Sequence, residues 1–301
     1  MGKITKVESK KHDEAMALLS LTRPLLPFEV DFVYENFNPM ANNDVGKNGV
    51  FFTPYDIAID LAQSCNPSGD IVDFGAGIGM CSWAMSIQLH SEPSHRHVAI
   101  EINPEFVEIG KKLQPNLEWY CASIFDLNFL KSLGFFDCAF GNPPYGNISA
   151  KTGTEWMLTK GPAEILTIEV AARISYNVGT FVIPSELADY EIDPERQKML
   201  RQSGKSFVKD PETFSTSKKS LLKAFPGLFF SAWDSGICLD NAMNWKGAKP
   251  KVDIVDVDPS DVTWERPYGF ADTEPKPVKP RVEIKTLKQM PNKHQDQLTL
   301  F

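Results

Sequence analysis

Cysteine is scarce in this chain of 301 residues, which has five cysteines and no C-x-x-C pair. An odd number without paired spacing gives no indication of a disulfide framework or a zinc site, which is typical of the reducing cytoplasm. Long apolar runs are also lacking, because no stretch approaches the ~20 residues of a membrane span. The first residues contain no apolar core of a secretory signal. We therefore expect a cytoplasmic protein with no membrane partner.

An excess of positive charge is lacking as well. The 31 Lys and Arg residues face 39 Asp and Glu residues, which gives a formal net charge of -8. Because proteins that bind nucleic acid usually carry a basic face, this average argues weakly against such a partner but leaves a local basic patch open. What the chain does have is an ordinary share of hydrophobic residues, 42%. That share supplies the core of one large domain, or of one with a smaller companion.

A turn at residues 141–145, Gly-Asn-Pro-Pro-Tyr, carries the most chemistry. It follows a predicted strand at 136–140, whose alternate apolar residues share one face. The two prolines end the strand, which places Asn142 and Tyr145 at a carboxyl edge, where open α/β sheets bind ligands. An amide and a flat ring suit a planar amine such as a nucleobase. Taken alone, the stretch is equally a proline-braced turn with a capping Asn.

A glycine turn at residues 75–79 follows a predicted strand at 70–74 and precedes a predicted helix at 80–89. Strand, glycine turn and helix in this order are typical of a nucleotide-type site, since glycines let a ligand approach the backbone. The spacing is not G-x-G-x-x-G and no Lys-Ser/Thr pair follows, which speaks against NAD or ATP. Asp73, just before the turn, suits a cationic ligand instead, such as the amino group of S-adenosylmethionine.

Two more acidic residues follow predicted strands. Glu101 closes a strand at 97–101, at a distance typical of an acid that binds both ribose hydroxyls. Asp126 comes after a strand at 117–121. It is either an acceptor for an adenine amino group or the cap of a helix at 127–133.

Residues 51–54, Phe-Phe-Thr-Pro, precede another predicted helix, with Thr53 as its N-cap and Pro54 as its first residue. In a functional interpretation, the two Phe side chains and the helix start form one wall of a pocket. The residues alone favour a well-started core helix. An earlier helix is expected over residues 12–21 and is ended by Pro24 and Pro27.

Together these segments resemble the amino-group DNA methyltransferases, specifically their adenine-N6 branch, over about residues 45–190. The motifs follow the family's gamma order, with the cofactor motifs before the catalytic one, and several motifs in one order are more specific than any alone. The resemblance implies an α/β fold, a Rossmann-like seven-stranded methyltransferase sheet with helices on both faces. It also implies S-adenosylmethionine as the cofactor and no catalytic metal.

The resemblance implies roles for the motif residues. In the family, the Asn side chain and the carbonyl of the first Pro accept the two hydrogens of the adenine amine, here Asn142 and Pro143. The nitrogen lone pair is thereby localised for attack, while Tyr145 stacks on the flipped base. Asn in place of Ser favours adenine over cytosine-N4. The implied catalytic residues are Asn142, Pro143, Pro144 and Tyr145, and the implied cofactor-binding residues are Phe52, Thr53, Pro54, Asp73, Gly75, Gly77, Gly79, Glu101, Ile102, Asp126 and Asn142.

The second half continues the predicted sheet, with a helix at 162–176 and a strand at 178–184. Segments 227–233 and 235–239 are expected to form the closing hairpin. Phe230 or Trp233 is a candidate for the other side of the base clamp, although core packing is the commoner role of such aromatic residues.

Residues 196–223 contain eight basic side chains and two acidic ones. This stretch, part of a small insert at about 190–225, predicts contact with DNA phosphates. A solvated helix face is the alternative. The predicted DNA-binding residues are Arg196, Lys198, Arg201, Lys205, Lys218 and Lys219.

The C-terminal residues 272–301 are rich in Pro, Lys and Glu up to residue 296, which predicts a disordered tail. Apolar residues return at the very end, in Gln-Leu-Thr-Leu-Phe. This segment resembles the short sliding-clamp-binding peptide of bacterial replication and repair proteins, although short motifs also recur by chance. A clamp would raise the local concentration at newly copied DNA. The implied clamp-binding residues are Gln297, Leu298, Leu300 and Phe301.

We therefore expect an N-terminal helical extension (1–45), a methyltransferase domain (46–250), a short peripheral segment (251–271) and a flexible tail (272–301). The expected activity is methylation of adenine N6 in DNA, in a bacterial or phage-infected cytoplasm. An RNA or protein-glutamine methyltransferase is the enzymatic alternative, because the same turn serves those amines and amides. A non-catalytic DNA- or clamp-binding module is the other alternative, and intact Asn142 and Asp73 argue against it.

Overall fold

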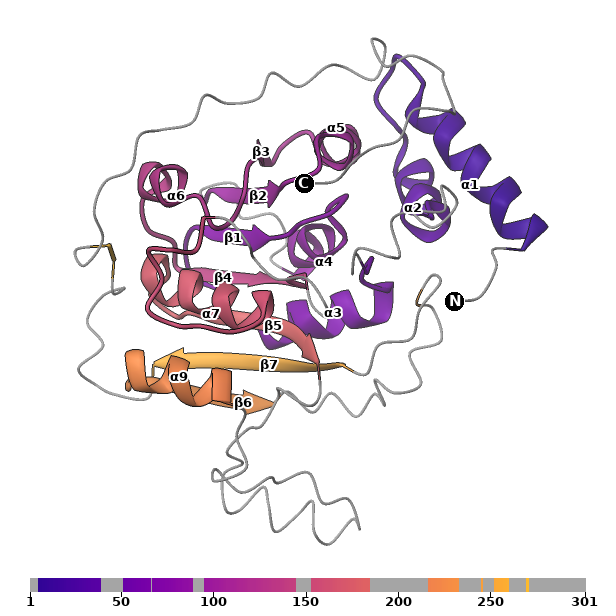
Figure 1. The fold of residues 1–301 in the computed structure, drawn as a ribbon. Helices are drawn as coiled ribbons and strands as arrows, with labels where there is room; N and C mark the ends of the chain where they lie inside the picture. The colour runs from indigo at the N-terminus through magenta and orange to yellow at the C-terminus, as the bar shows by residue number, and fades with distance from the viewer. Residues whose placement is uncertain are drawn as a thin grey trace, which may run out of the picture.

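A seven-stranded sheet forms the centre of the molecule (Figure 1). The computed structural model describes residues 5–38, 51–65, 67–88, 95–144, 153–184, 216–232, 245, 252–259 and 269–270. The strand order is β3-β2-β1-β4-β5-β7-β6. Strands β1 to β5 are parallel, whereas β7 runs antiparallel to both β5 and β6. The strands are β1 (Ile71–Phe74), β2 (His97–Glu101), β3 (Glu118–Cys121), β4 (Cys138–Gly141), β5 (Gly179–Pro184), β6 (Leu228–Ala232) and β7 (Val252–Pro259).

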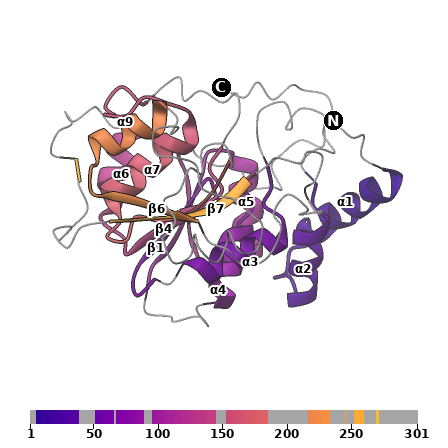
Figure 2. The same cartoon turned by 90° about the horizontal axis from the view of Figure 1, so that it is seen from below.

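Helices cover both faces of the sheet (Figures 1 and 2). One face carries α3 (Tyr55–Ser64), α4 (Met80–Gln88) and α5 (Pro104–Leu113), and the other carries α6 (Leu127–Leu133), α7 (Ala163–Ile174) and α9 (Thr216–Ala224). Each face has its own apolar core, because alternate strand residues point to opposite sides. Helix α7 is buried at all twelve positions, which explains why it has no polar face.

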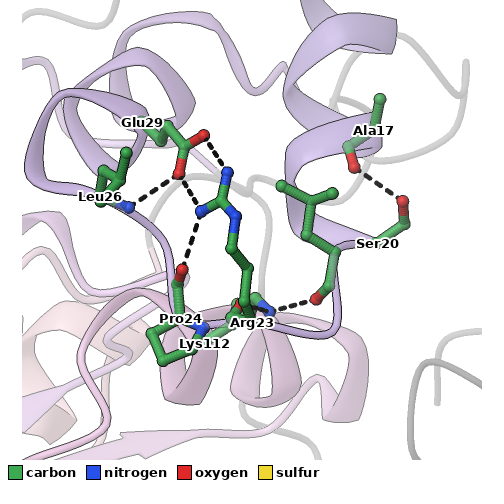
Figure 3. Close-up of polar contacts among 8 residues, drawn as sticks. Ala17, Ser20, Arg23, Pro24, Leu26, Glu29 and Lys112 are labelled. Carbon is green, nitrogen blue, oxygen red and sulfur yellow. Dashed lines mark hydrogen bonds and ion pairs between the residues drawn. The ribbon is translucent and has the colours of Figure 1, made fainter.

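Two N-terminal helices, α1 (Lys6–Leu19) and α2 (Pro27–Asn36), lie beside α4 and α5 (Figure 1). Thr5 and Glu8 form a capping box at the start of α1. In the connection, Arg23 donates two hydrogen bonds of 2.6 Å to the Glu29 carboxylate (Figure 3). The Lys112 ammonium of α5 donates to the carbonyls of Leu21 and Arg23. The helical pair is therefore tied to the domain that carries the sheet.

The expected seven-stranded α/β sheet is confirmed, and several expected details are wrong. Pro27 does not end a helix but begins α2, because proline is well tolerated in the first helical turn. The partner of β6 is β7, which lies in the segment that we expected to be peripheral, while residues 235–239 lie outside the described part. Phe136 precedes β4 and packs in the α6–α7 core, opposite Cys138 and Phe140.

Among the described helices, none is both long enough and apolar enough to cross a membrane.

Candidate functional site

The carboxyl ends of β1, β2 and β4 bring the predicted motifs to one edge of the sheet. The glycine turn after β1 has left-handed φ angles at Gly75, Gly77 and Gly79, 72°, 57° and 96°, which glycine adopts without steric cost. A Cβ atom on Gly75 would lie 3.7 Å from both the carbonyl oxygen of Asn142 and Cδ of Pro144. The structure therefore brings the glycine turn and the Asn-Pro-Pro segment into contact.

Asn142, directly after β4, is held by its amide nitrogen. Its Nδ2 donates to the carbonyl oxygen of Phe51 and to Oγ1 of Thr53, at 3.0 Å each. Because a carbonyl oxygen only accepts, the first contact fixes which end of the amide is nitrogen. The buried Oδ1 has no hydrogen-bond partner among the described residues. The site therefore contains an acceptor oxygen that is oriented by its own side-chain nitrogen.

Thr53 has a different position from the one expected. The N-cap of α3 is Pro54, and no side chain caps the helix, so the prediction of Thr53 as N-cap is wrong. Its buried hydroxyl instead accepts from Asn142 and, at 3.6 Å, from the thiol of Cys81. The hydrogen bond between Asn142 and Thr53 joins residues 89 positions apart in the chain, which is why local helix signals did not reveal it.

Phe52 packs against the glycine turn. A Cβ atom on Gly77 would lie 3.6 Å from the Phe52 ring, and that ring makes an edge contact with Phe106 at 5.1 Å between centroids. Phe37, just after α2, joins the same cluster at 5.8 Å from Phe52. Phe52 therefore lies beside the glycine turn and also packs against the apolar core of this face of the sheet.

Two buried carboxylates lie under the turn. Glu101 accepts from the backbone nitrogens of Gly77 at 2.9 Å and Asn103 at 2.7 Å. Asp73 is 1% exposed and accepts from the Ser82 hydroxyl at 2.7 Å, while its Oδ1 has no partner within the described part of the chain. Burial raises the pKa of Glu101, and burial raises the pKa of Asp73 to about 7. A cation bound beside them would offset this desolvation.

The other predicted site residues in the described part of the protein differ in their positions. Ile102 is 60% exposed beside Glu101, at the same edge of the sheet. Asp126 caps α6, accepting from the backbone nitrogens of Asn128 and Phe129, so the cap interpretation describes one of its oxygens. Pro143 and Pro144 continue from Asn142 at the edge.

Burial contradicts the predicted roles of two residues, one in DNA binding and one in the base clamp. Lys218 on α9 is 1% exposed, with its ammonium 4.5 Å from the centroid of the Phe230 ring, so it does not present its charge to a DNA phosphate. Phe230 is 3% exposed in the core and does not form a base clamp. Lys219, the next residue on α9, is exposed. The predicted residues outside the described part are Tyr145, Arg196, Lys198, Arg201, Lys205, Trp233 and the tail residues 297–301.

Sequence reasoning missed the polar residues that support the site. Ser82 donates to Asp73 at 2.7 Å, and His97 lies 3.1 Å from Ser82. The Gln114 amide donates to the carbonyl of Gly79 at 2.8 Å and to the hydroxyl of Tyr34 at 2.7 Å. A polar residue on the apolar face of a predicted helix was the available signal for Ser82. Within the described residues, no group of three His, Cys, Asp or Glu side chains is arranged to hold a metal ion.

Comparison with known proteins reveals the fold. No protein-family model and no curated protein matches the sequence. The structure is similar to the methyltransferase subunit of a type I restriction-modification system from Streptococcus thermophilus, with a TM-score of 0.50 and 13% identity over 80% of this chain. This chain spans about half of that subunit, 52%. The likeness shows that the chain has a methyltransferase fold.

Two further solved structures are more distant. A TehB-like S-adenosylmethionine-dependent methyltransferase from Corynebacterium glutamicum has a TM-score of 0.36 at 14% identity, over 68% of this chain and 86% of that one. The plantazolicin methyltransferase BpumL, in complex with a desmethylPZN analogue and SAH, has a TM-score of 0.40 at 13% identity, over 84% of this chain and 98% of that one.

Proposed function

We propose that this chain transfers a methyl group from S-adenosylmethionine to the N6 amino group of an adenine in DNA. The observation that carries the proposal is the Asn142 side chain. Its nitrogen is anchored by Phe51 and Thr53, and its Oδ1 is a buried acceptor with no partner among the described residues. A buried acceptor without a donor is costly, and it is satisfied when a substrate brings an N–H group.

The chemistry of an aromatic amine requires such an acceptor. The lone pair of the adenine amine is delocalised into the ring, which makes the nitrogen a poor nucleophile. Asn142 Oδ1 accepts one amine hydrogen and the carbonyl of Pro143 accepts the other, which concentrates the lone pair on nitrogen. Because Asn142 is already oriented by Phe51 and Thr53, little reorganisation is needed when the amine arrives.

The cofactor fits the residues at the edge of the sheet. The glycine turn permits close approach to the backbone, and Glu101 at the end of β2 supplies the acid that would accept from the ribose hydroxyls. The exposed Ile102 side chain offers an apolar surface to the adenine ring of the cofactor, and the buried Asp73 carboxylate matches the charge of its amino group. When bound, S-adenosylmethionine supplies a methyl group that its sulfonium already activates. The proposal needs no metal.

Tyr145 adds the stacking face for a base flipped out of the duplex. The DNA phosphates are assigned to the exposed Lys219 and to the basic residues Arg196, Lys198, Arg201 and Lys205. The resemblance of the Phe-Thr-Pro segment to DNA methyltransferases supports DNA over RNA or a protein glutamine. Those two substrates remain the alternatives for the same Asn-Pro-Pro-Tyr site.

One assay distinguishes the alternatives. Tritiated methyl transfer from S-adenosylmethionine is measured to unmethylated DNA, to RNA and to protein, with the wild type and Asn142→Ala. We expect transfer to DNA, reduced by at least about 100-fold in Asn142→Ala. Asn177→Ala, a change at the opposite end of the sheet, is the matched control. Transfer to RNA or protein only, or an active Asn142→Ala, would contradict the proposal. No transfer to any substrate would favour a non-catalytic module.

We also propose a bacterial sliding clamp as a partner, through Gln297, Leu298, Leu300 and Phe301 in the Gln-Leu-Thr-Leu-Phe end of the sequence. This places the protein in a bacterial or phage-infected cytoplasm. Deletion of residues 297–301 is expected to abolish clamp pull-down and to leave the basal methylation rate unchanged. Lys293→Ala is the control within the same tail. Equal pull-down by the deletion variant would refute this partner.

A further inference from the structure

Three polar side chains, from β1, α4 and β2, are connected by hydrogen bonds near the glycine turn. The Ser82 hydroxyl of α4 donates to Asp73 Oδ2 at 2.7 Å. On its other side, Ser82 Oγ lies 3.1 Å from Nε2 of His97, at the start of β2. Asp73 and Ser82 are 1% and 0% exposed, so the hydrogen bond between them is shielded from water, while His97 is half-buried. None of the roles proposed above uses Ser82 or His97.

The hydrogens available on Ser82, Asp73 and His97 determine which group donates in each hydrogen bond. A serine hydroxyl has one hydrogen, and Asp73 as a carboxylate can only accept it. Ser82 Oγ must then accept from His97, so His97 carries its proton on Nε2. The imidazole ring is held by an edge contact with Phe140 of β4, at 5.7 Å between centroids. The three residues thus form the ordered series His97 Nε2–H, Ser82 O–H and Asp73 carboxylate.

This series leaves one atom of Asp73 available. Oδ2 is taken by Ser82, whereas the buried Oδ1 has no partner among the described residues. A Cβ atom on Gly141 would lie 3.1 Å from Oδ1, so this oxygen lies against the residue that precedes Asn142. The unpartnered oxygen is therefore buried beside Gly141, the residue before the Asn-Pro-Pro segment, and a ligand donor would satisfy it.

We infer that Ser82 and His97 are positioning residues that keep Asp73 ionised and oriented to bind the cationic amino group of the cofactor. This inference rests on the proposed function, because it takes S-adenosylmethionine as the ligand. It assigns to α4 and β2 the control of cofactor affinity. The reacting methyl group is not touched by either residue.

The electrostatics of the pocket agree with this geometry. Burial raises the pKa of Asp73 to about 7, the Ser82 hydroxyl and backbone N–H lower it, and the nearby Glu101 raises it. Burial lowers the pKa of His97 to about 4, so its ring stays neutral. The other titratable groups that face Asp73 are Tyr34 of α2 and Cys81 of α4, and burial raises the pKa of both. Near neutral pH, these two groups do not titrate, whereas Asp73 does.

The ionisation of Asp73 determines how cofactor affinity changes with pH. Cofactor affinity is expected to fall as pH decreases through about 7, because Asp73 takes up a proton and loses its attraction for the cation. Removing the Ser82 hydroxyl takes away a bond to the charged form, which moves the pKa of Asp73 upward by about one unit. A shift of one unit lowers affinity about ten-fold on the acid side. The loss becomes smaller as pH rises toward 8.

The experiment measures S-adenosylmethionine binding to the full chain by calorimetry from pH 6 to pH 8. Ser82→Ala is expected to bind about ten-fold more weakly at pH 6, with a smaller loss at pH 8. His97→Phe keeps the ring contact with Phe140 and removes the donor, so its loss follows the same trend. His97→Gln restores an N–H at the reach of Nε2 and is expected to recover affinity.

The matched control is Ser86→Ala, one turn further along α4. Its hydroxyl donates to the carbonyl of Ser82 at 2.9 Å and is not part of the Ser82–Asp73 hydrogen bond, so its binding profile should equal that of the wild type. Asp73→Asn should remove the acid limb altogether. A loss in Ser82→Ala that is equal at all pH values, or an acid limb that persists in Asp73→Asn, would overturn the inference alone. A wild type that binds no S-adenosylmethionine would overturn the proposed function together with it.

Discussion

Replacing Thr53 by valine tests whether the Asn142 amide must be anchored. Valine has nearly the shape of threonine but no hydroxyl, so at the buried Thr53 position the main change is the loss of a hydrogen-bonding group. The substitution removes the 3.0 Å acceptor of Asn142 Nδ2 and leaves only the Phe51 carbonyl. The amide is then held at one point instead of two, and Oδ1 is oriented less strictly.

The size of the effect follows from one hydrogen bond. A net bond contributes about 0.5–1.5 kcal/mol, and a buried N–H left without an acceptor costs about 1–3 kcal/mol. Since about 1.4 kcal/mol is a factor of ten in rate, we expect kcat for DNA methylation to fall about ten-fold. Thr53 does not hold the cofactor through this bond, so the KM for S-adenosylmethionine should stay within about two-fold.

The assay is steady-state methyl transfer with both substrates varied. Thr53→Ser keeps the hydroxyl and is expected to retain most of the turnover, which separates the hydrogen bond from side-chain bulk. Unchanged kcat in Thr53→Val would refute the anchoring argument. A rise in the KM for S-adenosylmethionine at constant kcat would refute it too, because the effect of Thr53 would then come from the cofactor-binding role that the family resemblance implies and not from anchoring Asn142.

Two further predictions concern stability. The two Arg23 hydrogen bonds hold the pKa of Glu29 at about 2, below its ordinary value, so this stabilisation is fully present above pH 4.5 and is lost as pH falls toward 2. Glu29→Gln should therefore lower Tm at pH 7, and the difference from the wild type should vanish near pH 2. The control Glu14→Gln, in an exposed pair, should change Tm little. Glu169 and Arg173 form a fully buried ion pair of 2.9 Å in α7, so Glu169→Gln should cost about 3 kcal/mol in urea unfolding. A cost no larger than that of the exposed control Glu14→Gln would contradict this reasoning.

The positions of the parallel strands along the chain and the position of the glycine turn could be predicted from the sequence, whereas the order of the strands in the sheet comes from the structure. Short apolar runs ending in Gly75, Glu101 and Asn142 identify strands whose carboxyl ends share an edge, so the motifs alone bring the site residues together. Strand β7 could not be placed in this way, because its pairing with β5 and β6 depends on contacts more than 20 residues away along the chain. Lys218 had the pattern of a surface charge, and only the packing of α9 on Phe230 shows that it is buried.

Local sequence patterns also could not predict the hydrogen bonds that hold the site residues in place. Thr53 had all the features of a helix cap, yet its hydroxyl accepts from a side chain 89 positions later. Ser82 and His97 come from a helix and a strand whose apolar residues dominate the periodicity. The polar Ser82 on an apolar helix face was a local signal, but it did not reveal which residues Ser82 contacts. Sequence periodicity reports which face of an element is buried, whereas these contacts depend on how two elements meet in space.

The central claim is that Asn142 Oδ1 accepts a hydrogen from an adenine amine. The most direct measurement is mass spectrometry of nucleosides from unmethylated DNA after incubation with the protein and S-adenosylmethionine. The account predicts N6-methyladenine in the wild-type reaction and its loss in Asn142→Ala. N4-methylcytosine as the product, or N6-methyladenine at equal yield with Asn142→Ala, would contradict it.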